Sequence, residues 1–276
     1  MADLQIKFLL VLTCIGTLFI YSSVKADPRL WLPEGSQTGV AGAPPTEFLI
    51  EGQALEGQSL LGKLLFNSPS LLGEKAVRIG LSCNSCHPNG HVNTSFYISG
   101  LSGDPGTIDL SNSFWRKGTE DGKFNPIPIP SLRNISKTAP YGSQISLPSL
   151  PAFTRHVIVD EFDGPPPSAQ TMKALISYMN LLAKETSMDM SRQEKTIPLR
   201  RVFELLLPAL QSQDTKQLDS RIFLIKEELG RRVTPENRTR LEKKILQIKN
   251  IQENVVTDPE AAKAAYDILV YRAALN

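Results

Sequence analysis

The stretch that most constrains the fold is residues 67–150, which are dominated by Gly, Ser, Asn and Pro. Long helices and strands need sustained apolar periodicity, and this stretch contains few segments that have it. A domain of this size with so little regular structure needs something besides its own chain at its centre. We therefore expect a large, rigid cofactor to act as the nucleus of this part of the protein.

A cofactor motif lies inside the same stretch. The residues Cys83-Asn84-Ser85-Cys86-His87 spell C-x-x-C-H, which in an exported chain is typical of covalent attachment of a c-type haem. Two thiols three positions apart can each form a thioether with one haem vinyl group. The imidazole of the next residue can ligate the iron from the same side. The motif predicts one haem c, bound covalently through Cys83 and Cys86 with His87 as an iron ligand.

Three other interpretations of this motif remain open. A zinc site would need about four ligands, and only His91 and His156 remain beside the motif as further histidines. A redox-active disulfide would need a thioredoxin-like βαβ context, which the sequence lacks. A structural disulfide between the two cysteines is the third alternative.

The N-terminus has the pattern of a secretory signal over residues 1–26. Lys7 precedes a mostly apolar run, and Val24 and Ala26 occupy the −3 and −1 positions of a cleavage site. The run is shorter than the about 20 apolar residues that a membrane span needs. We expect cleavage near Ala26 and a periplasmic or otherwise exported mature chain. An uncleaved anchor and a lipoprotein modified at Cys14 are the alternatives.

The overall composition narrows the class of protein. The chain has 30 basic and 28 acidic residues, so it lacks the one-sided positive charge of a dedicated nucleic-acid binder. With 41% apolar and 21% charged residues it is too apolar for wholesale disorder and too polar for a polytopic membrane protein. We expect no nucleic-acid partner and no stable membrane span after cleavage.

The mature chain divides into three further regions, and the expected fold class is mainly α. Residues 27–50 read as an extended, Gly- and Pro-rich lead-in, 51–190 as a c-type cytochrome domain whose loops wrap the haem, and 191–276 as a C-terminal helical bundle or extension. In the cytochrome domain the apolar spacing predicts helices near 53–66 and 168–184, the second capped by Ser168.

Beyond residue 195 glycine almost vanishes, and charged and aliphatic residues predict three or four helices. One lies near 197–211 and is bent or broken at Pro208, and a second runs over about 215–229 and is closed by Gly230. A third opens at Thr234 and a fourth at Asp258, each followed by proline in the first helical position.

Two runs of the chain resemble the bacterial dihaem cytochrome c peroxidase and MauG-like family. The first is LLGKLLFNSPSLLGEKAVRIGLSCNSCHPNG, similar to the family's "G-x-x-L-F … S-C-x-S-C-H" pattern. The second is FNPIPIPSLRNISKTAPYGSQISLPSLPAFTRHV, similar to its "P-S-L-R-N-V-x-x-T-A-P-Y-x-H-D-G" stretch. The resemblance covers roughly residues 53–184. It implies a cytochrome c fold, a covalent haem, and either electron transfer or peroxide reduction.

The chain also departs from that family. Its members carry two C-x-x-C-H motifs and this chain has one, so a second electron would have to come from elsewhere. Val157 occupies the position that supplies an axial Met or Tyr in family members, while the neighbouring His156 matches a family histidine. His156 is therefore our predicted sixth iron ligand. The other candidates are an open iron or His91, Met172, Met179, Met188 and Met190.

Further side chains near the motif are candidates for supporting roles. Arg133 is predicted to pair with a haem propionate, because a guanidinium fork suits a carboxylate. Trp115 either packs at the haem edge or belongs to the core. Glu161 and Asp163 would serve as acid or base groups if the iron is open, and are otherwise solvated loop carboxylates.

Three functions are compatible with these features. The first is an exported monohaem cytochrome that exchanges single electrons with a redox partner protein. The second is a haem enzyme that reduces hydrogen peroxide or oxidises a protein partner. The third is a binding or assembly protein whose C-terminal helices dock a partner, with a mainly structural haem.

Overall fold

The computed structural model describes residues 45–50, 53–118, 120–142, 145–184 and 197–274. The predicted signal peptide and most of the predicted lead-in lie outside these ranges. The described elements, in chain order, are α1 (Gly57–Phe66), η1 (Pro69–Leu72), α2 (Glu74–Ile79), α3 (Cys83–Cys86), η2 (Pro88–Gly90), β1 (Thr107–Ile108), β2 (Ile127–Pro128), η3 (Ile135–Lys137), α4 (Leu150–His156), the π-helical η4 (Val157–Glu161), α5 (Ala169–Met179), α6 (Leu199–Glu204), α7 (Leu207–Gln211), α8 (Thr215–Arg231), α9 (Arg238–Asn254) and α10 (Pro259–Ala274).

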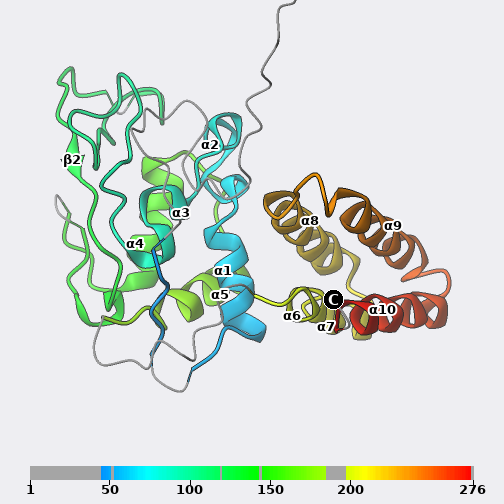
Figure 1. Ribbon diagram of the computed structural model, residues 1–276. Coiled ribbons are helices and arrows are strands. Elements are labelled where there is room, and N and C mark those ends of the chain that lie inside the picture. Colours follow the sequence, from blue (N-terminus) through cyan, green and yellow to red (C-terminus); the bar gives the residue numbers. More distant parts are fainter. Residues whose placement is uncertain (1–44, 51–52, 119, 143–144, 185–196, 275–276) are drawn as a thin grey trace, which may run out of the picture.

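The described chain is mainly helical, as the sequence predicts, and long loops occupy much of residues 88–149. The sheet in the described part has two short antiparallel strands, with Thr107 opposite Pro128 and Ile108 opposite Ile127. The second of these strands, β2, lies in a Pro-rich run. In Figure 1 these loops and β2 lie on the side of the molecule away from α8, α9 and α10.

The central packing of the first domain is between α1 and α5. Ser168 caps α5 as predicted, accepting a hydrogen bond from the backbone N–H of Thr171 at 3.1 Å. The two helices meet closely at Gly62, where an added Cβ would lie 2.0 Å from the carbonyl oxygen of Ala174. A side chain at position 62 would therefore separate α1 from α5.

Helix α5 ends at Met179, earlier than the predicted end at 184. The following residues pair instead with the end of the lead-in. The backbone N–H of Ile50 donates to the Leu181 carbonyl at 2.9 Å, and that of Ala183 donates to Phe48 at 2.9 Å. The lead-in thus lies against the body over its described part, and this long-range pairing ends the helix.

The C-terminal helices largely follow the sequence pattern, with three differences at their ends. The break in the first of them precedes Pro208, which takes the second position of α7. Gly230 does not close α8, because the helix continues to Arg231. Helix α9 begins at Arg238, four residues after Thr234, because a local turn comes first and the Thr234 N–H donates to Asn237 Oδ1 at 2.8 Å.

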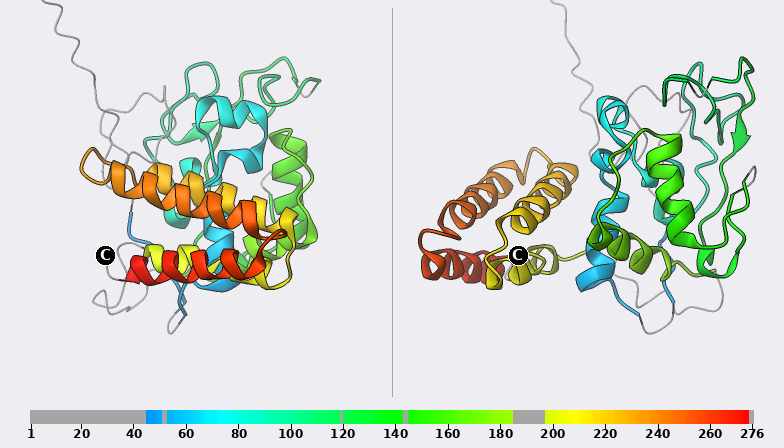
Figure 2. Two further views of the ribbon diagram at one scale, coloured as in Figure 1. Left: turned by 90° about the vertical axis from the view of Figure 1, so that its right-hand side faces the viewer. Right: turned by 180° about the vertical axis from the view of Figure 1, so that it is seen from behind.

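The structure has two helical parts, residues 45–184 and residues 197–274, which contact each other through α1 and α8. Figures 1 and 2 show α6–α10 gathered on one side of α1, with the loop-rich domain on the other. Arg231 on α8 donates to the Asn67 carbonyl at 3.2 Å, and Gln217 donates to Gln170 at 3.3 Å. Among the helices that the structure describes, none combines the length and apolar character that a membrane crossing requires.

Candidate cofactor site

The two motif cysteines lie on a single helical turn, α3. Residues three apart on a helix share one face, so the thiols of Cys83 and Cys86 are presented together. Ser82 and Ser85 fix the start of this turn, since the Ser82 N–H donates to Ser85 Oγ at 3.0 Å. Both thiols are free, so the structure contains no disulfide between them.

The two variable residues of the motif hold the loop that follows it. Asn84 Oδ1 accepts from the Asn89 N–H at 3.0 Å, and the Ser85 carbonyl accepts from Asn93 Nδ2 at 2.8 Å. The His87 N–H donates back to the Cys83 carbonyl at 2.9 Å. The cysteines and the histidine are therefore held by local backbone bonding as one unit.

A cavity of about 630 Å³ opens beside this unit, and Cys83, Cys86 and His87 all line it. Cavities that bind cofactors and other small molecules typically measure about 300–1,000 Å³ and are mostly apolar. Most of the lining here is aliphatic, aromatic or proline, contributed by α1, α3, β2, α4, η4 and α5 and by the loops. The arrangement suits a large apolar cofactor that contacts all of these elements at once.

The ring of His87 is oriented by a residue far away in the sequence. His87 Nδ1 lies 2.9 Å from the carbonyl oxygen of Pro130, and a carbonyl can only accept, so Nδ1–H is the donor. The other nitrogen, Nε2, then carries the lone pair. Burial lowers the pKa of His87 to about 4, against an opposing contribution from the Pro130 hydrogen bond. A neutral imidazole that donates its one N–H to a carbonyl and keeps a lone pair on the other nitrogen is the usual form of a metal-ligating histidine.

The environment of the two thiols keeps them protonated and therefore poorly reactive. Burial raises the pKa of Cys83 to about 12, and burial followed by the nearby Cys83 raises the pKa of Cys86 still further. Redox-active cysteines have lowered pKa values, so this environment argues against a thioredoxin-like dithiol. Within the described ranges no group of three or more His, Cys, Asp and Glu side chains is arranged to hold a metal ion, which gives the zinc interpretation no support.

His156, the predicted sixth ligand, also lines the cavity, at the end of α4. Its ring nitrogens face carboxylates: Nδ1 lies 3.2 Å from Asp160 Oδ2 and Nε2 lies 3.5 Å from Glu161 Oε1. Burial raises the pKa of Glu161, which also lines the cavity, although His156 opposes that shift. To ligate iron, His156 would have to give up one of these two contacts.

Arg133, the predicted propionate partner, is not among the residues that line the cavity. Its neighbours Ser131 and Leu132 are, so the backbone passes the cavity while this side chain does not reach its wall. The polar part of the lining includes Ser111 and Asn125 instead.

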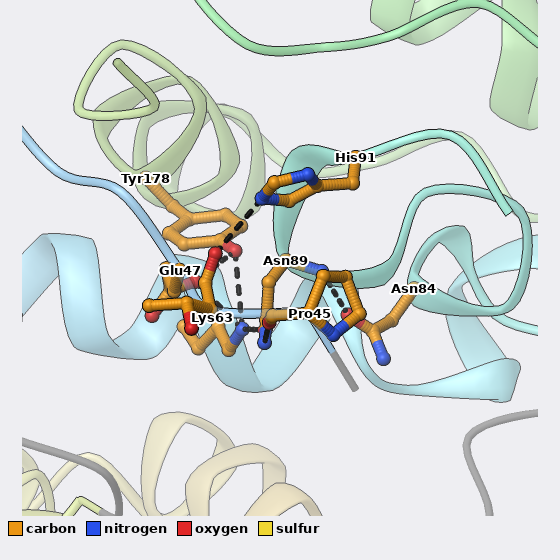
Figure 3. Close-up of polar contacts among 8 residues, drawn as sticks. Pro45, Glu47, Lys63, Asn84, Asn89, His91 and Tyr178 are labelled. Carbon is orange, nitrogen blue, oxygen red and sulfur yellow. Dashed lines mark hydrogen bonds and ion pairs between the residues drawn. The ribbon is translucent and has the colours of Figure 1, made fainter. Parts of the chain in front are cut away.

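The remaining predicted candidates fall into two groups. Met179 lines the cavity, whereas Met172 and His91 do not, and His91 Nε2 donates to the Thr46 carbonyl at 2.8 Å (Figure 3). Trp115 is a core residue, fully buried, with its Nε1–H donating to the Asp109 carbonyl at 2.7 Å. Met188 and Met190 lie outside the described residues.

A buried polar cluster beside the motif was not expected from the sequence (Figure 3). Lys63 on α1 is only 6% exposed, and its Nζ lies 2.7 Å from Glu47 Oε1 and 3.1 Å from the Tyr178 hydroxyl, with Asn89 Oδ1 as a third partner. Tyr178 donates to the same Glu47 oxygen at 2.5 Å. The feature of the sequence that could have revealed this cluster is the single lysine in the otherwise apolar run LLGKLLF. The cluster joins the lead-in, α1, α5 and the loop after the motif.

Comparison of the chain with protein-family models, with curated proteins and with solved structures finds no match. The resemblance to the dihaem peroxidase family therefore rests on the two sequence runs alone and stays a prediction.

Proposed function

We propose that this protein is an exported, cytochrome c peroxidase-like monohaem c-type cytochrome that exchanges single electrons with a redox partner protein. In this proposal Cys83 and Cys86 hold one haem c through thioether bonds, and His87 Nε2 ligates the iron. When bound, the haem supplies one-electron redox chemistry. Export follows from the pattern of residues 1–26 and would place the mature protein in the periplasm or another compartment outside the cytoplasm.

The observation that carries the proposal is the convergence of three groups at one apolar cavity. Two thiols on one helical turn and a histidine with its Nδ1–H held by Pro130 all line the same space of about 630 Å³. Each of these features also occurs singly in proteins that bind no haem. Together they match what a covalent haem needs from a chain, namely two neighbouring thiols, a neutral imidazole and an apolar enclosure.

The chain's own residues have distinct tasks in this proposal. Pro130 orients the His87 ring and keeps its other nitrogen unprotonated. The apolar walls, which include Phe66, Leu175 and Tyr141, exclude water from the cavity. Exclusion of water and of charged groups is one means by which a protein tunes the potential of its iron.

The test is to express the chain with its signal in a bacterium that matures c-type cytochromes, and then to denature the purified product. We expect the porphyrin to remain with the polypeptide after acid-acetone extraction and to appear in the intact mass. A double Cys83→Ala, Cys86→Ala variant should lose the covalent porphyrin, whereas His91→Ala, outside the cavity, should keep it. Absence of porphyrin from the wild-type polypeptide would overturn the proposal.

The sixth ligand is addressed by the spectrum of the same material. If His156 ligates the iron, the wild type is low-spin and His156→Ala changes that spectrum. An unchanged spectrum in His156→Ala removes this histidine as a ligand. Met179→Leu is the matched variant, because Met179 is the methionine that lines the cavity within the described ranges.

A second function, a haem enzyme that reduces peroxide or oxidises a protein partner, is favoured by Glu161. This partly buried carboxyl lines the cavity 3.5 Å from His156, and its burial raises its pKa above that of an ordinary glutamate. A group of this kind can deliver or accept a proton beside an open iron. Peroxide-dependent oxidation of a reduced donor, lost in Glu161→Gln, would support the enzyme. Low-spin iron inert to peroxide and cyanide would exclude it.

A further inference from the structure

A second cavity lies at the junction of the two helical parts and has no role in the function proposed above. It measures about 470 Å³ and is bounded by the start of α1 and by residues of α6, α7 and α8. Its lining mixes aliphatic side chains with polar and charged groups, including Gln58, Arg201 and Arg221. Junctions between domains are a preferred location for ligand sites.

The strongest feature of this cavity is the guanidinium of Arg221 on α8. The residue is only 6% exposed, and its Nη1 donates to the Leu205 carbonyl. Its Nε–H is buried and has no hydrogen-bond partner among the described residues. Leaving a buried donor of a charged group unsatisfied is costly, so a bound acceptor would stabilise this side chain.

A buried acceptor without a hydrogen-bond partner among the described residues belongs to α1, another element that lines the cavity. Gln58 Oε1, in the first turn of α1, is buried and unpaired among the described residues. A ligand that fits both groups must accept from Arg221 and donate to Gln58. This requirement distinguishes a protonated oxyanion from a fully deprotonated one.

The charges around the cavity permit an anion. Arg201 and Arg221 line it together with Glu56 and Glu204. Glu204 is engaged by Arg200, whose Nε lies 2.8 Å from its carboxylate. The guanidinium group of an arginine is well suited to bind oxyanions through parallel hydrogen bonds, and Arg221 offers its Nε–H at this cavity.

We propose that this junction cavity binds a small oxyanion that also carries a hydroxyl donor. The oxyanion accepts from Arg221 Nε–H, and the hydroxyl donates to Gln58 Oε1. Hydrogen phosphate and a small α-hydroxycarboxylate share this chemistry. Because the walls come from α1 on one side and α6–α8 on the other, the ligand would link the two helical parts.

The test is isothermal titration of the full chain, as purified, with inorganic phosphate, lactate and sulfate at constant ionic strength. We expect phosphate or lactate to bind with a Kd below about 1 mM. Sulfate has no hydroxyl at neutral pH and should bind about tenfold more weakly than phosphate. Tighter binding of phosphate would identify the ligand as a phosphate, and tighter binding of lactate would identify it as an α-hydroxycarboxylate.

Two variants and one control assign the binding to this cavity. Arg221→Met should weaken every ligand about tenfold or more, and the exposed Arg240→Met should leave the affinities unchanged. If Arg221→Met does not fold, Gln58→Leu keeps the proposal testable, because it should remove the preference for phosphate over sulfate. The proposal fails if neither phosphate nor lactate binds up to about 10 mM. It also fails if both cavity variants bind like the wild type.

Discussion

Replacement of Gly62 by alanine tests whether the packing of α1 against α5 stabilises the loop-rich part of the protein. An added Cβ would lie 2.0 Å from the Ala174 carbonyl oxygen and 2.8 Å from the Tyr178 Cβ. Ordinary contact begins at 3.4 Å, so the two helices would have to separate by about 1.4 Å at this point. The obstacle is backbone, which cannot rotate away as the end of a side chain can.

We expect Gly62→Ala to lower the free energy of unfolding by about 2–3 kcal/mol. Overpacking of a close contact costs about 1–3 kcal/mol or more, and the better helix propensity of alanine returns up to about 1 kcal/mol. This contact is at the severe end of that range. For a chain of this size such a loss corresponds to a melting temperature lower by roughly 4–12 °C.

The assay is urea unfolding followed by far-ultraviolet circular dichroism, with Gly230→Ala as the matched control. Gly230 lies inside α8, and an added Cβ there would meet nothing within 4 Å. This control should stabilise the protein by roughly 0.5–1 kcal/mol. If Gly62→Ala were as stable as Gly230→Ala, the close approach of α1 and α5 would be refuted.

Three further predictions concern buried charged groups. Burial alone would raise the pKa of Glu228, but the charges of Arg232 and Arg231 outweigh this effect and lower the pKa. The ionised Glu228 carboxylate therefore stabilises the folded protein at neutral pH, and this stabilisation is lost when the pH falls below the ordinary glutamate range. Glu228→Gln should cost about 1–3 kcal/mol at pH 7 and flatten the acid limb of a melting-temperature profile; an unchanged acid limb would contradict this. Burial raises the pKa of Glu161, so ionisation of this carboxyl destabilises the folded protein as the pH rises above the ordinary pKa of glutamate. The melting temperature of Glu161→Gln should therefore rise relative to that of the wild type between about pH 4 and 7. A constant difference across that range would count against it. Lys63→Met removes a buried cation that bonds Glu47 and Tyr178 and should cost about 1–3 kcal/mol in urea unfolding, whereas the exposed Lys137→Met should cost almost nothing; equal losses would show that the cluster is not stabilising.

Local features of the chain were predictable because they depend on neighbours in sequence. The hydrogen bonds that cap α5 at Ser168 and α10 at Asp258 span three residues, and each is formed as predicted. The three-residue spacing of Cys83 and Cys86 was also evident from the sequence, but the helical turn on which both thiols lie was not predicted. The prediction that Gly230 closes α8 was wrong, since the helix continues to Arg231; the preference of a single glycine for a helix end is weak.

The mainly helical class and the spacing of the cysteines and histidine followed from local sequence patterns, since helical periodicity, capping and motif spacing act over a few residues. The surroundings of the cysteines and the histidine depend on contacts between residues that are far apart in the sequence. The Pro130 carbonyl that orients His87 is 43 positions away, and the lead-in that ends α5 is more than 130 positions from Ala183. The burial of Lys63 and the pairing of His156 with two carboxylates depend on the same long-range packing. Such contacts are selected by the free energy of the whole core, and no local pattern encodes which distant groups will meet.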